Sequence, residues 1–195
     1  KFINLDHPAF LNRVPTTENL VSYLYDRLDN TLRTARADHQ LSRVTLYEEP
    51  TLWADAFPEA DTKRIQLTKA VRFSAARRLR SAALPGEETR GTFGKRQHLH
   101  GHDYELAVTI QGRIDPHTGM IIDLASLLQT IQTAVLDRFD HSYLNEDAEV
   151  FSTVNPTGEN LSKVIWGLLR PRLGPRLTKV SLREPPNTVF AYCGE

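Results

Sequence analysis

The chain has 195 residues, and its 24 basic and 24 acidic residues leave a formal net charge of zero. With 40% apolar and 25% charged residues, the composition is typical of a globular protein and argues against a general polyanion binder. No apolar stretch approaches the roughly 18 residues that span a bilayer, so we expect a cytoplasmic protein with no nucleic-acid partner and no membrane partner. Cys193 is the only cysteine, which excludes an internal disulfide, and the only methionine, Met120, is internal, so we expect a piece of a longer protein.

Residues 1–57 predict one helix followed by one strand. Thr17 is a suitable N-cap, and the apolar residues 20, 21, 24 and 28 after it fall on one helical face. Val44 and Leu46 then alternate along a strand that ends in Glu48. Residues 58–66 are predicted to be a linker.

Residues 67–195 predict a complete α+β unit. Alternating apolar residues predict strands around Phe73 and from Tyr104 to Ile110, separated by a long loop from Ser81 to Gly94. Asp123 and Thr157 are candidate N-caps of two helices, and further strands follow. The order of strand, strand, helix, helix, strand, strand indicates an antiparallel sheet with two helices on one face.

The back half of this unit repeats the first 57 residues at an offset of about 135 to 140 positions. Three signals recur in the same order: an Asp-His pair, a Pro-Thr helix start, and a strand that ends in glutamate. They are Asp6-His7, Pro15 to Leu20 and Val44 to Glu48 in the first copy, and Asp140-His141, Pro156 to Leu161 and Val180 to Glu184 in the second. We infer an internal duplication whose first copy lacks its front half.

Several side chains in these signals are candidates for chemistry. His100 and His102 lie two apart on a strand and can reach one metal ion, although they can equally be surface histidines and zinc needs a third protein ligand. Asp140-His141 and Asp6-His7 can each form an acid-base pair, or each can be a helix-terminal histidine beside a solvated aspartate.

Glu48 and Glu184 fall on the apolar side of their strands, where each needs a partner. A flat heterocycle with two adjacent N–H donors is one such partner, and exposure at a strand end is the alternative. Thr17 and Glu18, with Thr157 and Glu159, can supply further polar contacts or act only in helix capping. Residues 63–96 hold ten Lys or Arg and two acidic residues, which suits either an anion site or a solvated surface.

Taken together, these residues resemble the 6-pyruvoyl- and 6-carboxy-tetrahydropterin synthase family. The resemblance is carried by Phe73-Ser74-Ala75, Lys95 to His102, Gly119-Met120 with Asp123-Leu124, Asp140-His141 with Leu144-Asn145, Pro156 to Asn160, and Glu184. It implies a T-fold whose sheets join into a barrel in a homo-oligomer, with zinc as the cofactor. The implied activity is a carbon-oxygen lyase that eliminates triphosphate from dihydroneopterin triphosphate in pterin or queuosine-precursor biosynthesis.

The resemblance also assigns roles to single residues. His100 and His102 match two of three zinc histidines, but the third position holds Arg77. In the carboxy-pterin branch the catalytic cysteine stands four residues before the His-x-His pair, and that position holds Arg96. A guanidinium stays protonated and can replace neither a neutral zinc ligand nor a thiolate. Asp140-His141 and Asp6-His7 match the acid-base pair, and Glu184 and Glu48 the pterin anchor. The alternative to an active lyase is a catalytically inactive pterin-binding or scaffolding homologue.

Overall fold

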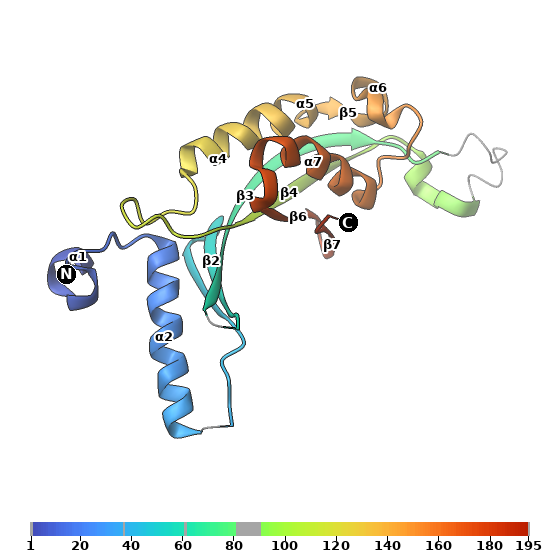
Figure 1. Ribbon diagram of the computed structural model, residues 1–195. Coiled ribbons are helices and arrows are strands. Elements are labelled where there is room, and N and C mark those ends of the chain that lie inside the picture. Colours follow the sequence, from blue (N-terminus) through green and yellow to red (C-terminus); the bar gives the residue numbers. More distant parts are fainter. Residues whose placement is uncertain (1, 37, 61, 81–90, 195) are drawn as a thin grey trace. The chain divides into compact units, whose positions relative to one another are not determined.

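The computed structural model describes residues 2–36, 38–60, 62–80 and 91–194. The chain forms two compact units: the first contains residues 1–69 and 109–124, and the second contains residues 70–108 and 125–195. Two long strands, β3 (Lys63–Arg77) and β4 (His100–Gln111), contribute to both units (Figure 1). Within the described residues, no helix has both the length and the apolar character needed to cross a membrane.

The first unit packs one long helix against a small antiparallel sheet. Its elements before β3 are α1 (Ile3–Asp6), η1 (Pro8–Phe10), α2 (Thr17–Ala35), β1 (Val44–Glu49) and β2 (Leu52–Pro58). β1 pairs with β2, and β2 pairs with the beginning of β3. The residues expected to be a linker therefore contribute to the β2–β3 hairpin, in which Pro58 lies opposite Lys63. The division of the chain at residues 57 and 67 remains a prediction.

Helix α2 begins one residue earlier than expected. The N-cap is Thr16, not Thr17, because the Thr16 backbone is extended and its side chain accepts a hydrogen bond from the Asn19 amide at 3.3 Å. The apolar stripe predicts that Val21 and Leu28 face the interior. Val21 is fully buried as predicted, but Leu28 is 49% exposed. The shift in the cap leaves the hydroxyl of Thr17 available for a partner other than its own helix.

The second unit has the predicted order of elements. After β4 come α4 (Leu124–Ile131), a π-helical turn (Gln132–Leu136), α5 (Asp137–Phe139), β5 (Ser142–Tyr143), α6 (Leu144–Asp147), η4 (Glu149–Phe151), α7 (Gly158–Leu173), η5 (Gly174–Arg176), β6 (Leu177–Glu184) and β7 (Thr188–Tyr192). The strand order within the unit is β3-β4-β6-β7, and the short β5 runs parallel to β3. Figure 1 shows α4, α5 and α7 on the same side of these strands, so the α+β arrangement is confirmed.

The core of the second unit lies between these helices and the sheet. Leu127 and Ile131 of α4 and Ile165 of α7 are fully buried, as are alternate residues of β4 such as Tyr104 and Leu106. Burying a large aliphatic side chain contributes about 1.5 to 3 kcal/mol, so this layer holds the strand ends in place. Of the loop expected at residues 81–94, residues 81–90 lie outside the described residues, and η2 (Gly94–Gln97) closes its end.

Candidate functional site

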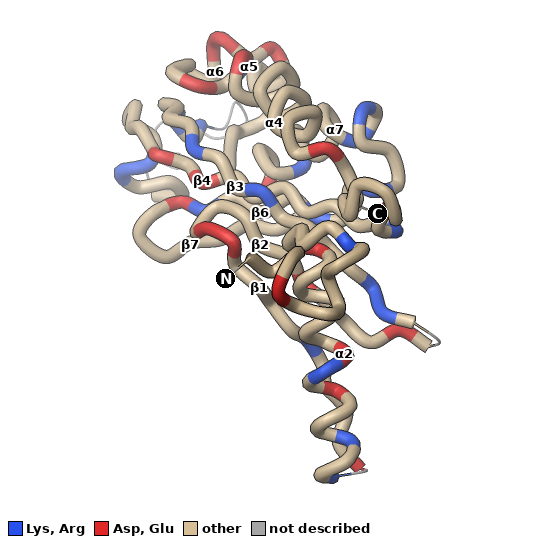
Figure 2. The backbone as a smooth tube through the Cα atoms, turned by 90° about the vertical axis from the view of Figure 1, so that its left-hand side faces the viewer, with Lys and Arg blue, Asp and Glu red and all other residues tan. Residues whose placement is uncertain are grey.

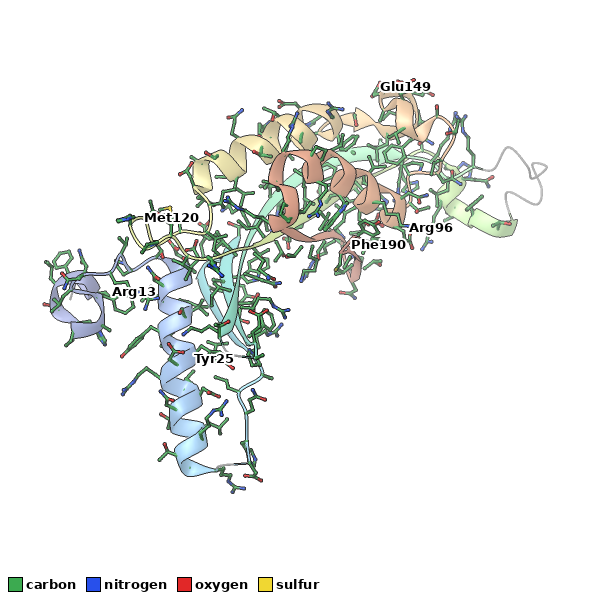
Figure 3. The ribbon with its side chains drawn as sticks, viewed as in Figure 1. Arg13, Tyr25, Arg96, Met120, Glu149 and Phe190 are labelled. Carbon is green, nitrogen blue, oxygen red and sulfur yellow. The ribbon has the colours of Figure 1, made fainter. Side chains whose placement is uncertain are left out.

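A cavity of about 430 Å³ opens in the first unit between the start of α2, the end of β1 and the loop that carries Met120 (Figure 3). Its wall is largely apolar, with polar groups gathered at the N-terminus of α2. The lining residues are Pro15, Thr16, Thr17, Glu18, Leu20, Leu46, Tyr47, Glu48, Leu52, Leu67, Met120, Ile122 and Leu124. An apolar cavity with a few convergent polar groups has the general form of a small-molecule site.

Thr17, Glu18 and Glu48 line this cavity together with the N-cap Thr16, and the first three are candidates from the sequence analysis. The Thr17 hydroxyl donates a hydrogen bond to Glu48 Oε2, and Glu18 Oε1 accepts one from the Ile121 amide at 3.1 Å. Burial raises the pKa of Glu18 above its ordinary 4.5, and the nearby charge of Glu48 adds to this effect. Neither carboxylate has a cationic partner among the described residues, so the cavity is rich in acceptors and suits a ligand that brings N–H donors.

The corresponding glutamate of the second unit has such a partner already. Glu184 is 7% exposed, and Arg77 Nη2 lies 2.8 Å from its Oε1 and 2.9 Å from its Oε2. Arg77 is itself 5% exposed, and its Nη1 donates to the Pro156 carbonyl at 2.7 Å. Glu184 is therefore buried and paired inside its own unit. Glu48 is exposed at the end of β1, which is the alternative that the strand pattern left open, and it lines the cavity from there.

The helix starts of the two copies have the same backbone and different side chains. Thr157 caps α7 as predicted, with the same φ of −69° and ψ of 162° as Thr16. The next position is Thr17 in the first copy and Gly158 in the second, so the second copy lacks the hydroxyl that in the first copy bonds to Glu48. Glu159, which follows, is exposed, unlike Glu18, which is 3% exposed.

The Asp140-His141 pair forms a hydrogen-bonded unit at the end of α5. His141 Nδ1 lies 3.0 Å from Asp140 Oδ1, which also accepts the Ser74 amide at 2.9 Å, and these bonds lower the pKa of Asp140. His141 is 83% exposed at its side chain and has a φ of 57°, a conformation that costs a non-glycine residue energy and is often found at functional sites. A carboxylate on Nδ1 leaves Nε2 facing solvent to take or give a proton.

Several acidic residues surround this pair. Figure 2 shows Asp and Glu along α5 and α6, and a shallow cavity beside the pair is lined by His102, Asp103 and Asp147. Arg78 adds one positive charge beside Glu146 and Tyr143, so both signs of charge lie around the pair.

The Asp6-His7 pair is not brought together in the same way. Asp6 accepts a hydrogen bond from the Phe2 amide at 2.8 Å, and His7 Nδ1 accepts one from the Ala9 amide at 3.2 Å. His7 Nε2 lies 3.4 Å from the hydroxyl of Tyr23 on α2. Among the described residues, the partners of Asp6 and His7 are therefore local backbone amides and Tyr23.

His100 and His102 lie together on β4, with ring centroids 5.0 Å apart. Burial, with Arg77, His100 and Arg96 nearby, lowers the pKa of His102 to about 4, and its buried Nε2 has no hydrogen-bond partner among the described residues. The third expected position, Arg77, is bonded to Glu184, and the described residues contain no cluster of three His, Cys, Asp or Glu that could hold a metal. These described residues do not form a three-ligand zinc site, and Arg96 is exposed.

Five of the nine basic residues that the structure describes between residues 63 and 96 form ion pairs. Lys63, Lys69, Arg72, Arg77 and Arg78 pair with Asp26, Glu49, Glu105, Glu184 and Glu146. This pairing favours the interpretation as an ordinary surface over that of an anion site.

Two features were missed by the sequence argument. The ion pair of Arg77 with Glu184 joins residues 107 positions apart, and no local pattern announces it. Phe190 on β7, which Figure 3 labels, packs onto Gly158, where an added Cβ would lie 2.1 Å from the ring. The replacement of Thr17 by Gly158 at matching positions of the repeat was the available signal for the second feature.

An antiparallel sheet with helices on one face, with Glu48 beside the start of α2 and Glu184 near the start of α7, is the arrangement expected of a T-fold protein. The family model for 6-pyruvoyl tetrahydropterin synthase matches residues 1–59 and 66–195. The chain is similar to 6-pyruvoyl tetrahydrobiopterin synthases of Drosophila melanogaster (38% identity over 132 residues, covering 66% of this chain and 79% of the relative) and Homo sapiens (38% over 133 residues, 67% and 92%).

Among solved structures, the 6-pyruvoyl tetrahydropterin synthase of Caenorhabditis elegans is 35% identical, with a TM-score of 0.65 over 68% of this chain and 96% of that chain. The chain belongs to the 6-pyruvoyl tetrahydropterin synthase family. The two matched segments agree with the tandem arrangement inferred from the repeat.

Proposed function

We propose that the chain is a tetrahydropterin synthase-type lyase that binds dihydroneopterin triphosphate through the cavity of its first unit. The observation that carries this proposal is the pair of uncompensated carboxylates beside Thr17 in an otherwise apolar cavity. A pterin ring presents an amino group and a ring N–H side by side, and both can donate to the two oxygens of Glu48. The aliphatic wall, including Leu46 and Leu67, would hold the faces of the flat ring.

Proton transfer is assigned to Asp140 and His141. Elimination of triphosphate requires a base that removes a proton from the substrate side chain while the C–O bond to the leaving group breaks. Asp140 orients the imidazole through Nδ1, and Nε2 exchanges the proton. Of the two Asp-His pairs that recur in the repeat, Asp140-His141 is hydrogen-bonded within itself and Asp6-His7 is not, among the described residues. We therefore infer that the cavity and the Asp140-His141 pair meet in a homo-oligomer, which the sheet edges at β1 and β7 would favour.

The test measures triphosphate release from dihydroneopterin triphosphate by the purified chain. Glu48→Gln should raise KM, and Asp140→Asn should lower kcat by about 10²-fold or more. Glu49→Gln changes the neighbouring exposed carboxylate, which pairs with Lys69, and should alter neither. Co-expression of Glu48→Gln with Asp140→Asn chains should recover part of the activity if the site forms between chains, and no recovery would assign both groups to one chain.

A second candidate is a pterin-binding homologue without turnover. It is favoured by Arg77 and Arg96, which stand where the family resemblance places a zinc histidine and the catalytic cysteine. In that case the wild type binds a pterin and releases no triphosphate, and Asp140→Asn leaves binding unchanged. Absence of both binding and turnover would refute both candidates.

A further inference from the structure

The second copy of the anchor site is filled by side chains of the chain itself. Its glutamate, Glu184, contacts the guanidinium of Arg77 at 2.8 and 2.9 Å, and both side chains are almost fully buried. The guanidinium also donates to the carbonyl of Pro156, which immediately precedes the helix cap. Arg77 thus joins the two elements, the end of β6 and the start of α7, that correspond to the walls of the first-unit cavity.

A guanidinium has the same donor pattern as the edge of a pterin. In a pterin ring, the carbon that bears the amino group is bonded to three nitrogens, as is the central carbon of arginine, so both are planar N–C–N donors. In the structure a single nitrogen of Arg77, Nη2, lies near both oxygens of Glu184. No such cation reaches Glu48 among the described residues of the first unit. The two copies therefore differ in the partner of the glutamate: Glu184 is bound by the guanidinium of Arg77, and Glu48 has no cationic partner among the described residues.

The space for the ring is also closed in the second copy. β6 and β7 pair Leu182 with Phe190, and β1 and β2 pair Leu46 with Ala54 at the matching place of the repeat. Phe190 covers Gly158 so closely that a Cβ there would meet its ring at 2.1 Å. The first copy thus has Ala54 and the hydroxyl of Thr17 at these two places. The second copy has Phe190 and Gly158 there.

We propose that the second copy is a self-occupied pterin-type pocket, in which Arg77 takes the place of the donor edge of the ligand and Phe190 takes up space for the ring. The chain then offers one pterin site, in its first unit, and the second unit keeps Glu184 for stability. This inference rests on the proposed function for the meaning of the first cavity, but the occupancy of the second pocket can be tested without it.

The first experiment removes the internal occupant and supplies a small replacement. Arg77→Ala should bind methylguanidinium, seen as a rise in melting temperature that saturates at millimolar concentration, and urea or ammonium should not reproduce the rise. The wild type should show no such rise. Arg78→Ala is the matched control, because Arg78 is the next residue, is 40% exposed at its side chain and lies 3.9 Å from Glu146. A folded Arg77→Ala protein that does not respond to methylguanidinium would overturn the proposal.

A second measurement leaves Arg77 unchanged. It tests whether the second pocket can bind neopterin even if Arg77→Ala does not fold. Neopterin titrated calorimetrically into the wild type should report a single site per chain, and Glu48→Gln should weaken that site without revealing a second one. A remaining site that disappears with Glu184→Gln would contradict self-occupancy. If the wild type binds no neopterin, the proposed function fails, while the methylguanidinium result still judges the second pocket. Combining Arg77→Ala with Phe190→Val should raise the neopterin stoichiometry from one to two.

Discussion

Replacing Arg77 by methionine should destabilise the second unit strongly at neutral pH. Both partners of the Arg77–Glu184 pair are buried, with 5% and 7% exposure, so the substitution leaves a carboxylate without its partner in the interior and leaves the Pro156 carbonyl without its donor. Breaking a buried pair in this way costs about 3 to 5 kcal/mol, a large part of the roughly 5 to 15 kcal/mol that stabilise a typical protein. The free energy of unfolding is measured by urea denaturation followed by circular dichroism.

A double-mutant cycle separates the cost of leaving Glu184 buried without a cation from the cost of removing the Arg77 side chain. Arg77→Met with Glu184→Leu should recover most of the stability, because replacing both members of a buried pair by apolar residues is often neutral or better. The cost of the single Arg77→Met change should also shrink toward pH 5, because a buried carboxylate without its cation has a raised pKa and folding then favours its protonation. A cost below about 1 kcal/mol, as for surface pairs, would refute the interpretation of Arg77 as a buried structural partner.

Two further predictions concern the first unit. Burial raises the pKa of Glu18 above 4.5, so the folded chain binds this proton more tightly than the unfolded chain and stability falls as the pH rises from 4.5 through the raised pKa. Glu18→Gln should therefore be more stable than the wild type at pH 7 and should lose this advantage near pH 4 in urea denaturation; an advantage independent of pH would contradict the role of ionisation. Gly119 has a φ of 75°, and a Cβ there would lie 2.7 Å from Asn19 Nδ2, so Gly119→Ala should lower the free energy of unfolding by roughly 1 to 2 kcal/mol or more. Gly167→Ala, at an exposed helical glycine with no neighbour within 4 Å, should instead stabilise by about 0.5 to 1 kcal/mol, and equal effects at the two glycines would show that backbone conformation is not the cause.

The order of elements could be predicted from the sequence because apolar periodicity and helix caps are local signals. The period-two pattern from Tyr104 to Ile110 and the cap at Thr157 both appear in the structure. The start of α2 was misplaced by one residue because Thr16 and Thr17 are both good caps, and only the bonds to Asn19 and Glu48 distinguish them.

The difference between the two candidate sites could be predicted only in part. Arg77 was recognised as a poor zinc ligand from its chemistry alone, but its bond to Glu184 depends on how β3 and β6 come together. Likewise, Asp6 and His7 are adjacent in the sequence, yet nearby backbone amides bond to each of them and keep them from forming the pair seen at Asp140 and His141.

The most direct test of the account is the affinity of the chain for neopterin with and without the Glu48 carboxylate. Loss of a charge-assisted hydrogen bond costs about 1.5 to 3 kcal/mol, so Glu48→Gln should raise the Kd by about 10- to 150-fold. Glu49→Gln, one residue further along β1 and paired with Lys69, should leave the Kd unchanged. Equal affinities of the wild type and Glu48→Gln would contradict the assignment of the first-unit cavity as the pterin site.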